Sequence, residues 1–447
     1  MTTDNTSDNI SGVISNISRK VIAVIFMKHK EHKLYENILR SELLPALGCT
    51  EPGAVGYAAA KAAEVLGTFP EHIDMYCSGN IIKNVKSVNV PNSNGMKGIE
   101  AAAVLGLLGG DPDNALEIFK NADEEKIAKT KDLIENGFCK VLLEENEGNL
   151  YIHAIAYNGN DTANVIIKNT HTNIVYISKN DSVLLDETEK YSNETFETDF
   201  MSVHGILDYA EHTSLKILKE IMEPQVKFNY EIALEGLANN YGARVGQTLL
   251  NSYGHDIKTR AKAKAAAGSD ARMGGSSLPV IINSGSGNQG ITLTVPVIEY
   301  AGEYGVSEEK FYRAMAISNL VSIHIKKNIG KLSAFCGAVS AACGAGAAIS
   351  YMLGLGEKAI CNTITTTLAN VGGIFCDGAK ASCAAKIASS IDAAILAHEM
   401  SKCGESFQPG DGIVSDNIED TIRNFGIVGR DGMHETDISI MKLMINC

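Results

Sequence analysis

The chain of 447 residues has no tryptophan and only nine prolines. Charged residues interrupt every long apolar run. Few prolines beside 42 glycines are typical of a tightly packed protein with close backbone contacts, not of a low-complexity chain. The apolar run Val21–Met27 is too short to span a bilayer, and no small-residue cleavage site follows it. We therefore expect no membrane association, no secretion and a location in the reducing cytoplasm.

Several catalytic signatures are also missing. The sequence contains no HExxH, no paired CxxC and no Ser-His-Asp order, which disfavours zinc and serine hydrolases. A net charge of −14 argues against general binding to nucleic acid or anionic membranes, so small metabolites are the expected partners. Lys380 could be a pyridoxal phosphate lysine, but a lone lysine in an alanine-rich helix is usually solvated or paired, and we predict no pyridoxal phosphate.

The pattern predicts an α+β fold, with a predominantly α-helical catalytic bundle and a small antiparallel β-sheet region. We divide the chain at residues 1–33 (a polar, poorly ordered extension), 34–135 (mixed), 136–200 (antiparallel β) and 201–447 (helical). In the mixed part we expect helices over 35–47 and 54–67, a strand over 73–77 and a helix over 98–109. Four β-rich runs at 140–145, 150–157, 162–169 and 172–178 predict a meander, and residues 279–283 a brief strand. Whether the small sheet takes part in catalysis stays open.

Ten cysteines are far too few for a disulfide scaffold in a chain of this length. Six of them lie between Cys336 and Cys403. Cys336, Cys376 and Cys383 stand among small residues, where three thiolates can hold a [4Fe-4S] cube and leave one iron open. Cys376 and Cys383 are seven residues apart, so we expect Cys376 in a glycine-containing loop and Cys383 in the following helix. Cys343 is a rival ligand, and buried apolar packing of all these thiols is the alternative.

Two polar turns are candidate anion sites. The glycine-rich segment Asn283-Ser284-Gly285-Ser286-Gly287-Asn288 can present amides to a carboxylate or phosphate, although it lacks nucleotide-binding spacing. Ser78-Gly79-Asn80, with Lys83 and Asn84, forms the second turn. Either can also be a satisfied connection without a ligand.

The segment Gly48–Pro52, GCTEP, places Cys49 and Glu51 where a helix begins. A helix N-terminus lowers the pKa of a thiol, so we expect Cys49 to act as a proton acceptor or nucleophile with Glu51 as its helper. An incidental cysteine beside a first-turn acid is an equal alternative.

Eight motifs in order resemble the L-cysteine desulfidase family, a relative of the iron–sulfur L-serine dehydratase alpha chain. They are GCTEPGAVGYAAAKA, CSGNIIKN, GIEAAAVLG, GSDARMGG, NSGSGNQG, SNLVSIHIKKNIGKLSAFCGA, GAGAA and GIFCDGAKASCAAK. The resemblance extends from about Leu34 to the C-terminus and implies an oxygen-sensitive [4Fe-4S] lyase that converts L-cysteine to pyruvate, ammonia and hydrogen sulfide.

The same resemblance implies the roles of individual residues. Cys336, Cys376 and Cys383 would be the three ligands of the cluster, and Cys49 would transfer the proton. An L-serine dehydratase with the same chemistry, a non-catalytic iron–sulfur sensor and a purely structural helical protein remain as alternatives. Small residues at helix contacts favour a homodimer.

Overall fold

The computed structural model describes residues 30–145, 147–148, 150–188, 199–330 and 333–445. The predicted polar extension therefore lies outside the described residues, except for residues 30–33, which begin a helix over residues 30–42. The run Val21–Met27 lies outside them as well. Among the residues that are described, no helix is long and apolar enough to cross a membrane.

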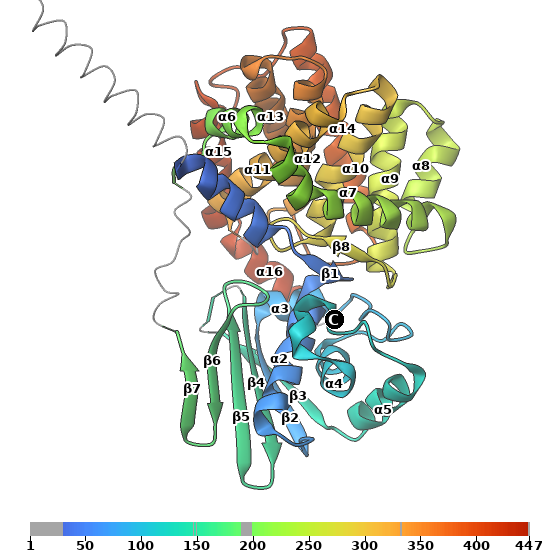
Figure 1. The fold of residues 1–447 in the computed structure, drawn as a ribbon, viewed down its shortest axis with the longest axis vertical. Coiled ribbons are helices and arrows are strands. Elements are labelled where there is room, and N and C mark those ends of the chain that lie inside the picture. Colours follow the sequence, from blue (N-terminus) through green and yellow to red (C-terminus); the bar gives the residue numbers. More distant parts are fainter. Residues whose placement is uncertain (1–29, 146, 149, 189–198, 331–332, 446–447) are drawn as a thin grey trace, which may run out of the picture.

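One part of the molecule is built on a six-stranded sheet (Figure 1). Its strands are β2 (His72–Ser78), β3 (Cys139–Glu144), β4 (Tyr151–Asn158), β5 (Asp161–Lys168), β6 (Ile174–Lys179) and β7 (Ser182–Asp186), in the order β3-β2-β4-β5-β6-β7. The four predicted strands are present, but β3 pairs in parallel with β2, which separates it from β4. The prediction of a meander was therefore wrong, because β3 pairs with the buried strand β2 from an earlier part of the chain.

Short helices complete this part. They are α2 (Thr50–Leu66), α3 (Gly79–Val85), α4 (Ile99–Gly109), the 3-10 helix η1 (Pro112–Glu117) and α5 (Glu124–Glu135). The alanine-rich helix α2 packs on β4 and β5 and against α4. Gly106 permits that contact, since a Cβ there would lie 2.5 Å from the Cα of Gly56.

The second part is helical, as expected. Its elements are α6 (Val203–His212), α7 (Leu215–Ala238), α8 (Val245–Tyr253), α9 (Ile257–Met273), α10 (Gly287–Tyr304), α11 (Glu308–Ile329), α12 (Gly337–Met352), α13 (Glu357–Val371), α14 (Cys383–Lys402), α15 (Ile418–Ile427), the short π-helix η3 (Val428–Gly432) and α16 (His434–Ile445). The helix α12 is buried and close to α11, because a Cβ at Gly344 would lie 2.2 Å from the Ser318 carbonyl oxygen. The α+β class is confirmed.

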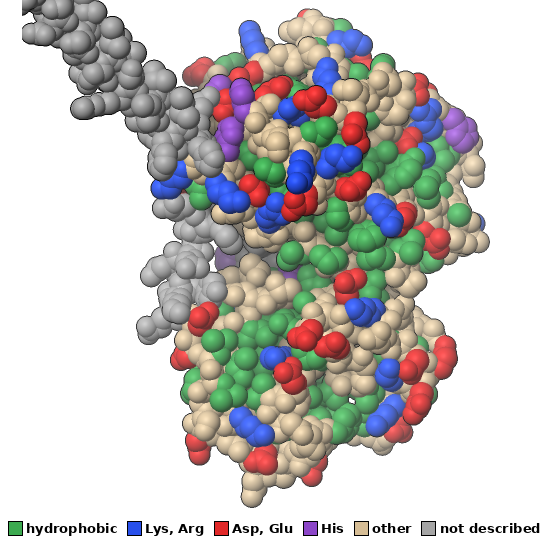
Figure 2. Space-filling view, in the orientation of Figure 1, with side chains coloured by type: hydrophobic (Ala, Val, Ile, Leu, Met, Phe, Trp, Pro, Cys, Tyr) green, Lys and Arg blue, Asp and Glu red, His purple; other side chains and the backbone are tan. Residues whose placement is uncertain are grey.

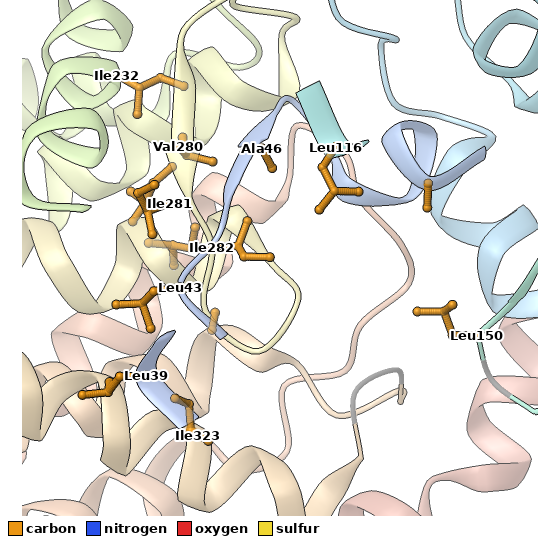
Figure 3. Close-up of a cluster of buried hydrophobic side chains, with 14 of the residues drawn as sticks. Leu39, Leu43, Ala46, Leu116, Leu150, Ile232, Val280, Ile281, Ile282 and Ile323 are labelled. Carbon is orange, nitrogen blue, oxygen red and sulfur yellow. The ribbon is translucent and has the colours of Figure 1, made fainter. Parts of the chain in front are cut away.

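A two-stranded antiparallel sheet links the N-terminal helix to this bundle. Strand β1 (Pro45–Leu47) pairs with β8 (Pro279–Ile281), and Leu39 and Leu43 pack beside it (Figure 3). The helix expected over 35–47 therefore ends at residue 42. Beyond this helix, Pro45–Leu47 forms backbone hydrogen bonds with β8, and Ala46 is buried.

The surface drawn in Figure 2 mixes positive and negative side chains, with hydrophobic ones gathered on the sheet-containing part and across the middle. On this face no basic stripe of the kind that follows a nucleic-acid backbone is visible.

Candidate active site

One cavity, of about 100 Å³, lies where α3, α10, α12 and the start of α14 meet. Its walls are formed by Cys49, Glu51, Asn80, Lys83, Asn84, Arg272, Ser286, Asn288, Gln289, Lys326, Ser333, Phe335, Cys336, Gly337, Ala338, Cys376, Gly378, Ala379, Cys383 and Ile387. The three predicted ligands and the predicted proton-transfer pair thus face the same space, although they come from distant parts of the sequence.

Backbone hydrogen bonds hold two of the cysteines side by side. The N–H of Cys336 donates to the Ile374 carbonyl at 3.0 Å, and the N–H of Cys376 donates to the Ala334 carbonyl at 2.5 Å. Cys336 is the N-cap of α12, whereas Cys376 lies in the loop before α14.

Cys383 is the first residue of α14, as the spacing predicted. Gly378, with φ of +93°, lies in the turn between Cys376 and Cys383, and a Cβ at this position would lie 2.7 Å from the Lys83 carbonyl oxygen. Cys343, the rival, is fully buried within α12 and is not among the cavity residues.

The thiols face a positive electrostatic environment. Both α12 and α14 direct their N-termini towards the cavity, which favours an anion there. Burial raises the pKa of Cys336 to about 12, so it is a thiol without a metal. Burial lowers the pKa of Lys326 to about 8, against the opposing influence of Cys376 and Cys336.

Within the described ranges, no group of three or more His, Cys, Asp or Glu side chains could hold a single metal ion. A cube makes a different demand, because each cysteine binds its own iron and the sulfurs stand further apart than around one ion. Three cysteines on one cavity, two helix N-termini and buried cations fit such an anionic cluster.

Three buried cations form another wall of the cavity. Arg272, at the end of α9, is 2% exposed, and its Nε has no hydrogen-bond partner among the described residues. Gly287 makes room for it, since a Cβ there would lie 2.4 Å from that Nε. Lys83 and Lys326 are buried as well, and Lys83 pairs with Asp437 of α16. A buried guanidinium whose Nε has no partner is suited to binding a carboxylate.

Cys49 and Glu51 form a hydrogen-bonded pair. The Sγ of Cys49 donates to Oε2 of Glu51 at 2.8 Å, and Nδ2 of Asn84 donates to Oε1 at 3.0 Å. Burial and the charge of Glu51 raise the pKa of Cys49 well above its usual range. The lowered pKa expected at a helix N-terminus is therefore wrong here, because burial outweighs the helix dipole.

Glu51 itself is charged. Burial alone would raise the pKa of Glu51, but His171 and the Cys49 thiol outweigh it and bring the pKa to about 2. The Glu51 carboxylate accepts a hydrogen bond from the Cys49 thiol, so it is placed to receive that proton, although a pKa this low makes it a weak base.

Six of the predicted site residues do not line the cavity; they are Ser78, Gly79, Asn283, Ser284, Gly285 and Gly287. Ser78 precedes α3 and accepts from the Tyr151 N–H. Asn283 is buried and bonded to Asn319 and Ser322, which holds the tight turn in place.

Three residues at or beside the cavity, Arg272, Lys326 and His171, were not predicted from the sequence. The first two lie in motifs that were recognised, GSDARMGG and SNLVSIHIKKNIGKLSAFCGA, but nothing local showed that their cations turn inward. His171 gave no signal, because only folding brings the β5–β6 turn to Glu51.

The chain is similar over most of its length to proteins of one family. Residues 113–442 match the family model described as Serine dehydratase alpha chain. A UPF0597 protein of Lachnoclostridium phytofermentans is 50% identical over 93% of this chain and 100% of its own length. A UPF0597 protein of Desulfitobacterium hafniense is 46% identical over 94% of this chain and 99% of its own, and one of Bacteroides fragilis is 37% identical over 94% and 99%.

The chain belongs to the serine dehydratase alpha chain family. The relationship to the iron–sulfur L-serine dehydratase alpha chain that the motifs implied is thereby confirmed. The match supports a lyase of the serine dehydratase type.

Proposed function

We propose that the protein is an iron–sulfur-dependent L-cysteine desulfidase, which eliminates L-cysteine to pyruvate, ammonia and hydrogen sulfide. The main support is that the hydrogen-bonded Cys49–Glu51 pair opens on the same cavity as Cys336, Cys376 and Cys383. A base and a set of metal ligands are thus available to one small substrate.

In this proposal Cys336, Cys376 and Cys383 would hold a [4Fe-4S] cluster. When bound, the cluster supplies a Lewis acid at its open iron for the leaving group of the substrate. The rest of the chemistry falls to the protein's own side chains.

The cations bind and orient the substrate. Arg272 and Lys326 attract its carboxylate, and the polar groups of Ser286, Asn288 and Asn80 lie on the same walls. Lys83 is held in place on the same wall by its ion pair with Asp437. Because the cations are buried, they bind a carboxylate more strongly than surface lysines would.

The pair formed by Cys49 and Glu51 removes the Cα proton. Glu51 accepts the thiol proton of Cys49 while Cys49 Sγ takes the proton from Cα. The electron pair of that C–H bond forms the Cα–Cβ double bond, and the Cβ–S electrons leave with sulfur. The aminoacrylate product becomes an imine and hydrolyses to pyruvate and ammonia in water.

L-Serine dehydration by the same groups is the second candidate, and the name of the matching family favours it. A direct competition separates the two: anaerobic enzyme receives equal L-cysteine and L-serine, and sulfide and pyruvate are measured together. Sulfide equal to pyruvate supports the desulfidase. Pyruvate without sulfide identifies a serine dehydratase, and neither product points to a non-catalytic iron–sulfur protein.

We also propose that the enzyme is located in the cytoplasm. A cluster with an open iron and free thiols is suited to a reducing cytoplasm. We also propose a homodimer, and the domain boundaries at residues 34, 136 and 201 remain part of the proposal.

A further inference from the structure

His171 lies in the turn between β5 and β6, outside the cavity wall yet next to the catalytic pair. Its side chain is 5% exposed, and its Nε2 is 3.7 Å from Oε1 of Glu51. That nitrogen has no hydrogen-bond partner among the described residues. A buried polar atom without a partner is uncommon and calls for a functional reason.

The turn that carries His171 reaches between two other segments. A Cβ on Gly285 would lie 2.9 Å from Cε1 of His171, so only glycine leaves room for the imidazole. Thr50 Oγ1 lies 2.9 Å from the Gly285 carbonyl and 3.0 Å from Oε2 of Glu51. The imidazole is therefore enclosed by the start of α2 and by the turn before α10.

Glu51 depends on its neighbours for orientation. Its Oε2 faces Cys49 and Thr50, whereas Oε1 has the amide of Asn84 and, further off, His171. At 3.7 Å the contact with His171 is too long for a hydrogen bond. Contacts of this kind are often long without substrate and shorten when it binds.

We propose that His171 is a positioning residue, whose Nε2–H closes onto Oε1 of Glu51 when the substrate binds and keeps Oε2 directed at the Cys49 thiol. The small sheet thereby takes part in catalysis. This inference rests on the proposed function.

The proton balance does not involve His171. One proton moves from Cα to Cys49 Sγ, and the former thiol proton moves to Oε2 of Glu51. Once the substrate is bound, His171 only donates a hydrogen bond to Oε1 of Glu51 and transfers no proton.

The test compares two replacements of similar size. His171→Gln keeps an N–H donor, whereas His171→Leu has none. His153→Gln is the matched control, because His153 lies in β4 of the same sheet and bonds Asn164 instead. All are loaded with iron anaerobically, and kcat and KM for L-cysteine are measured beside iron content.

We expect His171→Leu to lower kcat about 10–100-fold, as loss of a group that orients a catalytic residue does, with KM and iron content unchanged. His171→Gln should recover most of kcat, and His153→Gln should match wild type. A wild-type kcat in His171→Leu, equal losses in the Leu and Gln variants, or loss of iron would each overturn the inference. If the Leu variant does not fold, His171→Asn replaces it, since its shorter donor does not reach Glu51.

Exchange of the Cα proton of L-alanine in D2O, followed by NMR, separates this inference from the proposed function. L-Alanine has no leaving group, so exchange reports the base alone. Wild-type exchange that is slowed in His171→Leu supports the inference even if no elimination of cysteine or serine occurs, a result that would refute the proposed function. Normal elimination with a fully active His171→Leu refutes the inference only, and wild type with neither reaction refutes both.

Discussion

Lys83 Nζ lies 2.5 Å from Oδ1 of Asp437, and both side chains are buried. The pair joins α3 at the cavity to the C-terminal helix α16, 354 residues along the chain. Asp437 also accepts from Nδ2 of Asn80 at 2.9 Å, so one carboxylate fixes two residues of the cavity wall.

Removing this carboxylate should weaken both the fold and the site. We expect Asp437→Ala to lower the free energy of unfolding by about 3–5 kcal/mol, because Lys83 is left buried without its counter-ion. Urea unfolding of the iron-free protein measures the loss. Asp431→Ala is the control, since its exposed pair with Arg430 should contribute less than about 1 kcal/mol. Equal losses in the two variants would contradict this account.

Replacement of the cluster ligands should remove iron. Cys376→Ala and Cys383→Ala should each lack the brown chromophore and activity in anaerobic protein. Cys343→Ala is the matched control, because this buried cysteine does not line the cavity and should keep its iron. Full iron and activity in the Cys376 and Cys383 variants would exclude them as ligands.

Cys49 should be needed for turnover and not for the cluster. A hydroxyl at this position is a far weaker acid than a thiol, so Cys49→Ser should keep its iron while kcat falls by about 10²–10⁴. Iron content and kcat are measured on the same preparation. Iron loss in this variant would instead make Cys49 a ligand.

Arg272 should act on substrate affinity. Hydrogen bonds to charged groups contribute about 1.5–3 kcal/mol, so Arg272→Gln should raise KM for L-cysteine about 10–100-fold. The control is Arg40→Gln, which alters only exposed pairs with Glu36 and Glu220. An unchanged KM would exclude Arg272 from carboxylate binding.

His398 should make stability depend on pH. Its Nδ1 bonds Ser350 at 2.9 Å between α12 and α14, and burial lowers the pKa of His398 below 6.5. The unfolded chain then binds the proton more tightly, so the free energy of unfolding is steady above pH 6.5 and falls as the pH drops through the folded value.

Urea unfolding of iron-free wild type and His398→Gln, from about pH 5 to about pH 8, tests this dependence. The slope in the acid range should be smaller in the variant. The exposed His204→Gln should keep the wild-type slope. Identical slopes in wild type and His398→Gln would contradict the assignment.

Local patterns predicted much of the fold. The β-rich runs predicted the strands of the sheet, and the glycines before Cys383 correctly predicted that Cys376 lies in a loop. Neither the parallel pairing of β2 with β3 nor the antiparallel pairing of Pro45–Leu47 with β8 could be predicted, because both join segments remote in sequence.

The site divides in the same way. The candidate thiols can be chosen from the sequence because they lie among small residues. Arg272 and Lys326 look like ordinary helix cations until their burial is known. The protonation of Cys49 was misjudged for a similar reason. A helix N-terminus is visible in the sequence, but the desolvation that overrides it is not.

The central claim is that the three cysteines hold a cluster with an open iron that serves elimination. Iron, acid-labile sulfide and L-cysteine lyase activity of one anaerobically reconstituted preparation test it most directly. The account predicts about four irons per chain, with sulfide and pyruvate formed in equal amounts. Colourless, iron-poor protein after reconstitution would contradict it.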